Sequence, residues 1–164
     1  MNVAVGKILV ADHDGTFVIK LVGDVRVTIC VAFDEYLAKM LVPGNFHSVI
    51  IDLSDANGID STTLGLLAKV AIQSARQFNY RPMIISTNES ITRLIESMGF
   101  DAVFDICTEP LRIEKSLRAL QIVNCTEDTV RDKVIEAHRQ LMDLNDENRT
   151  KFSELVTSLE SATG

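Results

Sequence analysis

A short apolar segment followed by a run of hydroxyl residues constrains the fold of this chain more than any other feature. Residues 48–53 read Ser-Val-Ile-Ile-Asp-Leu without alternation, which is typical of a strand covered on both faces. A polar turn is expected at residues 55–59, and residues 60–63, Asp-Ser-Thr-Thr, then precede a helical pattern that begins at Leu64. A helix start stabilises anions such as phosphate, because its first N–H groups lack intrahelical partners. The segment therefore predicts hydroxyl groups at an anion-stabilising helix start.

The rest of residues 1–120 alternates between strand and helix patterns. Strand-forming runs at 7–11 and 17–22 flank an Asp-Gly pair that favours a tight hairpin. The later patterns are a helix at 30–41, the strand at 48–53, a helix at 64–78, a strand at 82–86, a helix at 88–99, a strand at 102–106 and a helix at 108–120. Such alternation implies parallel strands joined by right-handed crossovers. We expect an α/β domain over residues 1–120, with a mixed sheet of four to five strands and four crossover helices.

A polar helical extension follows at residues 121–164. Thr126, with two acidic residues after it, predicts a helix start, and Val134, Leu141 and Leu155 keep a seven-residue register. These apolar positions are too sparse to form a core of their own. Two interpretations remain open: the extension folds back on the domain, or it pairs with a second copy in a homodimer or docks on a partner. A break at residues 145–148 would divide it into two helices.

Net charge, apolar runs and cysteine content indicate in which compartment the protein works and which kinds of partner it is not expected to bind. The net charge of −7 argues against binding to nucleic acid or to an anionic membrane surface. No run approaches the roughly 20 apolar residues that cross a bilayer, and the first residues lack the order of a secretory signal. Cys30, Cys107 and Cys125 are odd in number and share no metal-ligand spacing, so we expect reduced thiols in the cytoplasm.

No catalytic, metal-binding or cofactor-binding set is recognised. His13, His47 and His138 lie far apart, and we expect them in a turn, at a strand entry and on a helix surface, respectively. Asp12 and Asp14 fit a hairpin turn better than part of a metal loop. An enzyme acting on a phosphorylated ligand at the helix start would lack a general base. We therefore expect neither catalysis nor a cofactor.

The hydroxyl run itself has two interpretations. Asp, Ser and Thr are the preferred residues at a helix N-cap, so residues 60–63 fit a simple cap. One cap, however, needs one side chain, and four capping-type residues stand here in succession. Residues alone leave both the cap and the anion site open.

Two stretches carry a family resemblance. Val49-Ile50-Ile51-Asp52-Leu53-Ser54 and Ile59-Asp60-Ser61-Thr62-Thr63-Leu64-Gly65 resemble the signature of STAS domains, especially those of bacterial anti-sigma factor antagonists. The similar layout runs from about residue 7 to residue 120 and includes Leu21-Val22-Gly23-Asp24 and Met98-Gly99-Phe100. Thr63 stands where the family usually has Gly, and Arg26 stands near where many relatives carry an acidic residue.

The resemblance implies a partner switch. In that family the serine of the Asp-Ser pair, here Ser61, is phosphorylated by a kinase that is often the anti-sigma factor itself, and a phosphatase reverses the modification. The unphosphorylated protein binds its target. Thr62 and Thr63 are the alternative phosphoacceptors. The partner-binding residues that the resemblance implies are Asp24, Asp60, Ser61, Thr62, Thr63 and Leu64. The alternative role is a STAS subunit of a lipid-transport or signalling assembly that does not switch.

Overall fold

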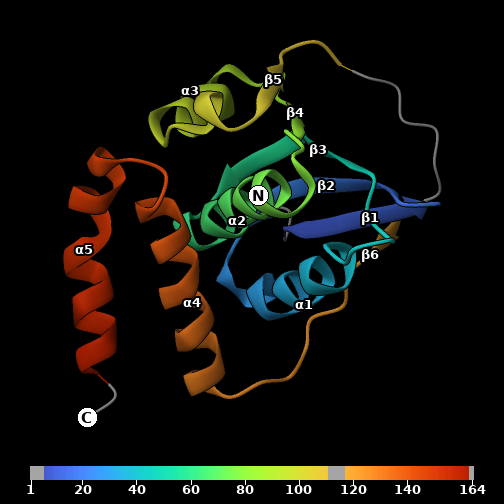
Figure 1. Cartoon of the computed structure of the whole chain (residues 1–164). Helices are drawn as coiled ribbons and strands as arrows, with labels where there is room; N and C mark the ends of the chain where they lie inside the picture. Colours follow the sequence, from blue (N-terminus) through green and yellow to red (C-terminus); the bar gives the residue numbers. More distant parts are fainter. Residues whose placement is uncertain (1–5, 111–116, 163–164) are drawn as a thin grey trace, which may run out of the picture.

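The computed structural model describes residues 6–110 and 117–162, and in them it contains a mixed six-stranded sheet with helices packed against it (Figure 1). The strands are β1 (Lys7–His13), β2 (Thr16–Val25), β3 (Ser48–Ile59), β4 (Met83–Ile85), β5 (Asp105–Cys107) and β6 (Arg118–Ala119). The helices are α1 (Cys30–Met40), α2 (Ser61–Phe78), α3 (Glu89–Ser97), α4 (Glu127–Met142) and α5 (Asp146–Ser161), with single 3₁₀ turns at Val27–Ile29 and Phe100–Ala102.

The sheet has the order β5-β4-β3-β2-β1-β6. β1 and β2 form the predicted antiparallel hairpin, whose turn places Asp14 at φ 49° and Gly15 at φ 90°. The strands β2, β3, β4 and β5 run parallel to their neighbours. Along the chain, α1 connects β2 to β3, and α2 connects β3 to β4. The predicted α/β class and mixed sheet are confirmed, and the sheet has six strands in the described residues where four to five were expected.

The predicted helix at 108–120 is wrong at its C-terminal end. Arg118 and Ala119 form β6, which pairs with β1, and the Leu120 N–H donates to the Ile8 carbonyl at 2.9 Å. This pairing satisfies part of the edge of β1, which would otherwise present unpaired backbone groups. Residues 108–110, where that helix was expected to begin, are not helical, and residues 111–116, including Ile113, lie outside the described residues.

The predicted turn at residues 55–59 is also wrong. β3 continues to Ile59 and stays paired with β2 as far as Val25, with a shift in register near Gly23. Pairing with a neighbouring strand therefore overrides the turn preference of these polar residues. As a result β3 delivers the chain directly to Asp60, at the start of α2.

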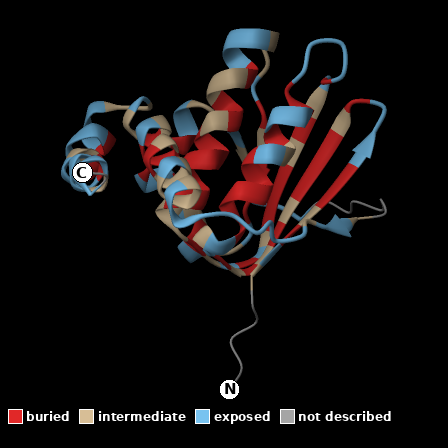
Figure 2. Ribbon diagram, turned by 90° about the horizontal axis from the view of Figure 1, so that it is seen from below, coloured by how far each residue is buried: buried red, intermediate tan, exposed pale blue. Residues whose placement is uncertain are grey.

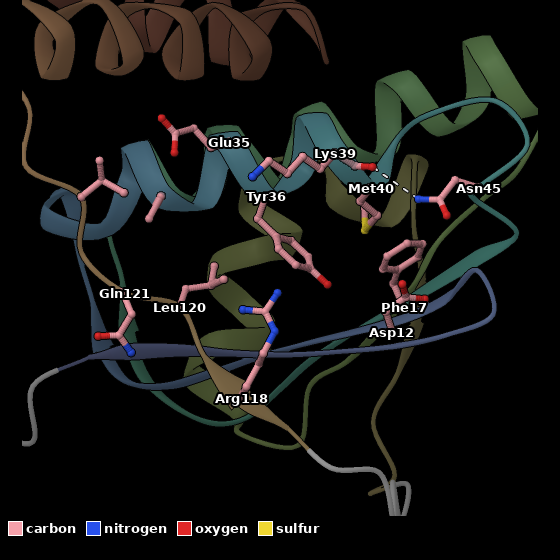
Figure 3. Close-up of a pocket in the computed structure, with 12 residues that line it drawn as sticks. Asp12, Phe17, Glu35, Tyr36, Lys39, Met40, Asn45, Arg118, Leu120 and Gln121 are labelled. Atoms are coloured by element: carbon pink, nitrogen blue, oxygen red, sulfur yellow. Dashed lines mark hydrogen bonds between the residues drawn. The ribbon is translucent and has the colours of Figure 1, made fainter.

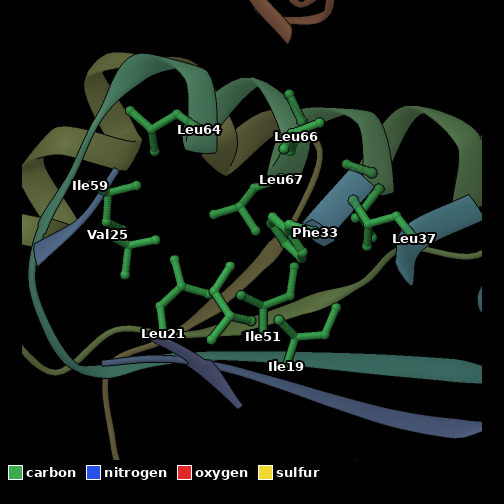
Figure 4. Close-up of a cluster of buried hydrophobic side chains, with 14 of the residues drawn as sticks. Ile19, Leu21, Val25, Phe33, Leu37, Ile51, Ile59, Leu64, Leu66 and Leu67 are labelled. Atoms are coloured by element: carbon green, nitrogen blue, oxygen red, sulfur yellow. The ribbon is translucent and has the colours of Figure 1, made fainter. Parts of the chain in front are cut away.

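The core lies between the sheet and the helices α1 and α2. Leu64 and Leu67 of α2 point toward Leu21 and Ile51 of the sheet, and Phe33 of α1 packs beside them (Figure 4). All five side chains are at most 1% exposed. Burial of an apolar side chain of this size stabilises the fold by about 1.5–3 kcal/mol.

The C-terminal extension folds back on its own domain as two helices. α4 packs against α2 and α1, and α5 packs on α4, so that α5 lies at the side of the molecule away from the sheet (Figures 1 and 2). The predicted break is confirmed, because the Asn145 side chain caps α5 by accepting the Asn148 N–H at 2.7 Å. The Asn148 side chain, fully buried, donates to the Met98 and Leu141 carbonyls at 2.8 and 2.9 Å.

Candidate functional site

Asp60 caps α2 and leaves the neighbouring hydroxyl group free for another role. Its carboxylate accepts the Thr63 N–H at 2.9 Å, and its carbonyl accepts the Leu64 N–H at 3.0 Å. Its backbone is extended, as expected for an N-cap residue. Ser61 is therefore the first helical residue, and its hydroxyl group takes no part in the cap.

The Ser61 hydroxyl group contacts a histidine of the C-terminal extension. Ser61 Oγ and His138 Nε2 are 2.7 Å apart, and His138 Nδ1 lies 2.7 Å from the Val134 carbonyl oxygen. A carbonyl oxygen only accepts hydrogen bonds, so Nδ1 carries a proton and donates to Val134, and Nε2 is left to pair with the Ser61 hydroxyl group. The phosphoacceptor predicted from the sequence is thus joined directly to α4.

The prediction that His138 is a surface residue is wrong. Its side chain is 2% exposed, and its ring packs edge-on against Phe152 of α5 at 5.3 Å between centroids. A helix that is polar along most of its length predicts solvent exposure on all but one narrow face. Here α4 lies between α2 and α5, which buries a second part of its surface.

A serine hydrogen-bonded to a histidine also occurs in hydrolases, but this pair lacks the other parts of such a site. The partner of His138 Nδ1 is a backbone carbonyl, whereas a hydrolytic triad orients the histidine with a carboxylate. Of five of the best-formed cavities among the described residues, none is lined by Ser61 or His138. The geometry is that of a packing contact between α2 and α4.

Gly65, one helical turn after Ser61, brings the backbones of α2 and α4 together. A methyl group at Gly65 would lie 2.0 Å from the Ala137 carbonyl oxygen, far inside any tolerated contact. Both residues are buried. The absence of a side chain at Gly65 therefore permits α4 to approach α2 this closely.

A cluster of four charged residues joins α1, α2 and α4. Lys69 Nζ contacts Asp34 Oδ1 at 2.8 Å and Glu136 Oε1 at 2.6 Å, while Lys133 Nζ contacts Asp34 Oδ2 at 2.5 Å. Burial acts to raise the pKa of Asp34, but the hydrogen bonds from Lys133 and Lys69 outweigh it and hold the pKa below its usual range. Burial acts to lower the pKa of Lys69, and its bonds to Asp34 and Glu136 outweigh that effect and raise it.

The structure separates the predicted partner-binding residues into two groups. Asp24 lies near the carboxyl end of β2, beside Gly58 of β3, and its carboxylate bonds to Arg26 at 2.8 Å. Asp60 and Ser61 are half-buried at the nearby start of α2. The other three are buried, with exposed fractions of 5% or less: Thr62, Thr63 and Leu64. In this conformation Asp24, Asp60 and Ser61 are partly exposed, and the hydroxyl group of Ser61 is engaged by His138.

Sequence reasoning missed His138, Gly65 and the charged cluster as parts of this region. One signal was present: residues 64–72 read Leu-Gly-Leu-Leu-Ala-Lys-Val-Ala-Ile, which is apolar almost all round the helix. Such a helix is buried on more than one side. The sequence does not say which distant segment covers the second side.

A separate cavity of about 330 Å³ lies beside α1 (Figure 3). Tyr36, Lys39 and Arg118 line it together with apolar residues, and the Arg118 guanidinium lies 5.7 Å from the centre of the Tyr36 ring. Burial raises the pKa of Tyr36. No histidine or cysteine lines this cavity, and no cluster of metal-ligating side chains occurs in the described residues.

Among the residues that the structure describes, no helix is both long and apolar enough to cross a membrane.

Comparison with known proteins identifies the family. The STAS domain model matches residues 7–119 of this chain. No curated protein gives a match to the sequence. A solved structure, an anti-sigma factor antagonist from Mycobacterium paratuberculosis, is similar with a TM-score of 0.53 and 20% identity, covering 64% of this chain and 87% of that chain. At this identity the similarity shows the fold alone. Because the family match covers more than half of the sequence, the chain belongs to the STAS domain family.

Proposed function

We propose that this chain is a partner-switching regulator of the anti-sigma factor antagonist type. In its unphosphorylated form it binds an anti-sigma factor or serine kinase, and phosphorylation of Ser61 releases it. The observation that carries the proposal is the position of Ser61, the first residue of α2, with a hydroxyl group that the cap does not use. The role is one of signal transduction to transcription in a bacterial cytoplasm, with a serine phosphatase to reverse the modification.

The local electrostatics support this mechanism. The start of α2 carries a partial positive charge, so it tolerates a phosphate on Ser61 without unfolding of the domain. A phosphate adds nearly two negative charges at a surface that already presents Asp60 and Asp24. A partner that fits this surface closely is then repelled by charge and excluded by bulk.

Burial favours Ser61 over the two neighbouring threonines as the phosphoacceptor. Ser61 is half-buried, whereas Thr62 and Thr63 are 5% and 1% exposed. A kinase must place the acceptor hydroxyl group in its own active site, which requires access from outside. The two threonines therefore need a larger local opening than Ser61 does.

The test is phosphorylation of the full chain in lysate of its source bacterium supplied with ATP, followed by peptide mass spectrometry. We expect phosphate on the peptide that contains Ser61, and none on that peptide in Ser61→Ala. Ser90→Ala is the matched control, since Ser90 is an exposed serine in the first turn of α3. Undiminished phosphorylation of that peptide in Ser61→Ala would rule out this phosphoacceptor.

A second measurement tests partner exclusion. The wild type, Ser61→Asp and the control Ser90→Asp are each used to capture the partner, and the captured amount is compared. We expect a large loss only for Ser61→Asp. Equal capture by all three would favour the alternative role, a STAS subunit of a lipid-transport or signalling assembly that binds without switching. The contact between Ser61 and His138 is the observation that keeps this alternative open, because it gives the hydroxyl group a structural role.

A further inference from the structure

We infer that α4 covers the start of α2, where Ser61 lies, and that docked α4 and a phosphate on Ser61 exclude each other. This inference rests on the proposed function, because it takes Ser61 as the modified residue. It goes further in giving the C-terminal extension a role: α4 occupies the surface of α2 that a kinase or partner must reach.

Three residues of α2, one turn apart, form the covered surface, which we call the α2 stripe: Ser61, Gly65 and Lys69. Residues spaced by four lie on one face of a helix. Each of the three contacts one of three consecutive residues of α4. Ser61 bonds to His138, Gly65 lies against the Ala137 backbone, and Lys69 pairs with Glu136. Three consecutive residues of α4, within one helical turn, thus contact the stripe along its whole length.

The contacts leave no place for a phosphoryl group on Ser61. The Ser61 Oγ atom lies 2.7 Å from the His138 ring, which is a hydrogen-bond distance with nothing between the two atoms. A phosphoryl group adds four heavy atoms at Oγ. His138 cannot swing away alone, because Phe152 packs on its ring and its Nδ1 is bonded to Val134. Accommodating the phosphate therefore requires α4 to move.

A small shift of α4 is also excluded. The two backbones are in contact at Gly65, one turn from Ser61, so α4 cannot slide along α2 without breaking its packing there. Packed interfaces of this kind have discrete arrangements and do not deform continuously. α4 therefore has two states, docked on α2 and undocked from it.

The undocked state leaves no unpaired charge in the domain. Asp34 and Lys69 both belong to the STAS part of the chain and pair with each other at 2.8 Å without α4. The groups that leave, Lys133 and Glu136, are 29% and 39% exposed in the docked state and become hydrated. Residues 121–126, which connect β6 to α4, are exposed and form no regular structure, so they permit the movement.

By linkage, a phosphate that excludes docked α4 is itself disfavoured while α4 is docked. Kinase access follows the fraction of molecules in which α4 is undocked, and phosphorylation then keeps α4 undocked. The same argument applies to a protein partner that needs the α2 stripe.

The covering of residue 61 by α4 can be tested without a kinase, in a protein whose single thiol stands at position 61. Ser61→Cys is made in the full chain with Cys30→Ala, Cys107→Ser and Cys125→Ser, and its alkylation by iodoacetamide is followed by intact mass. A second protein adds Ala137→Glu, which puts a bulky charge at the contact with Gly65. A matched control adds Gln140→Glu, which places the same charge on α4 at a half-buried position.

We expect alkylation at least tenfold faster with Ala137→Glu and within twofold of the starting protein with Gln140→Glu. Hydrogen exchange of the β3 amides is measured alongside and should remain slow in all three proteins.

If Ala137→Glu also speeds exchange in β3, the decisive variant is Lys133→Glu. This substitution places a negative charge beside Asp34 at a partly exposed position, and we expect the same tenfold increase in the rate of alkylation. Equal alkylation rates in the starting protein and in the variant that disrupts α4, with β3 still protected, would show that α4 does not cover residue 61. Failure of Ser61 phosphorylation in the lysate experiment would refute the proposed function and leave this result unaffected.

Discussion

The two faces of α2 are held by different kinds of interaction. The inner face packs Leu64 and Leu67 against the sheet, and both side chains are at most 1% exposed. The outer face meets α4 through a serine-histidine hydrogen bond, a glycine-alanine backbone contact and the cluster of ion pairs, together with apolar packing in which Ala137 and Leu141 of α4 are fully buried. Exposing large apolar side chains to water is costly, whereas polar contacts can be exchanged for contacts with water at a small net cost. Because the outer face depends partly on polar contacts, we expect it to separate at a lower cost than the inner face.

The largest expected effect is on the inner face. Leu67→Ala should lower the free energy of unfolding by about 2 to 5 kcal/mol, because it leaves a cavity in the core. Urea denaturation followed by circular dichroism measures the change. If the loss were under about 1 kcal/mol, the inner face would not be the part that holds the domain together.

A smaller effect is expected at the charged cluster on the outer face. Lys69→Met removes one of the two lysines paired with Asp34 and should cost about 2 kcal/mol, between the values typical of exposed and of buried ion pairs. Hydrogen exchange should show the increase mainly in the amides of α4. Arg93→Met is the matched control, since Arg93 pairs with Glu89 on an exposed helix surface. Equal effects of the two substitutions would contradict a special role for the cluster.

Acid should weaken the outer face through the same cluster. The pKa of Asp34 lies below its usual range in the folded protein, so its stabilisation is complete above the ordinary aspartate pKa of about 3.9 and is lost as the pH falls through the lower folded value. We expect the free energy of unfolding of the wild type to fall more steeply below about pH 4 than that of Asp34→Asn. Parallel curves from urea denaturation at each pH would show that Asp34 does not contribute.

The smallest effect concerns the exposed pair on α3. Arg93→Ala removes an ion pair whose side chains are 75% and 81% exposed. Such pairs contribute about 0.3–0.5 kcal/mol. A larger loss in the free energy of unfolding, measured by the same denaturation assay, would mean that an exposed ion pair stabilises this protein as much as the partly buried cluster does.

The parts that the sequence predicted are those set by local pattern. The Asp-Gly hairpin, the apolar strand in β3 and a helix cap within residues 60–63 follow from turn chemistry, hydrophobicity and capping preference. β6 was missed because two residues of strand carry almost no pattern, and their structure depends on the edge of β1. The length of β3 was missed because its pairing with β2 overrides the turn preference of its last residues.

The candidate site shows the same division. Ser61 was found from a local motif, whereas His138 lies 77 positions further along the chain and reaches Ser61 only when the extension folds back. The polar sequence of α4 allowed docking on the domain, on a second copy or on a partner. Those alternatives differ only in tertiary packing, which periodicity does not encode. A homodimer through the extension stays an untested prediction.

The central claim is that docked α4 and a modified Ser61 exclude each other. The most direct measurement is hydrogen exchange of the full chain carrying phosphoserine at position 61, installed during translation, against the unmodified protein. We predict exchange at least tenfold faster in the amides of α4, with those of β3 unchanged. Equal protection of α4 in the two proteins, with the phosphate confirmed on residue 61, would contradict the account.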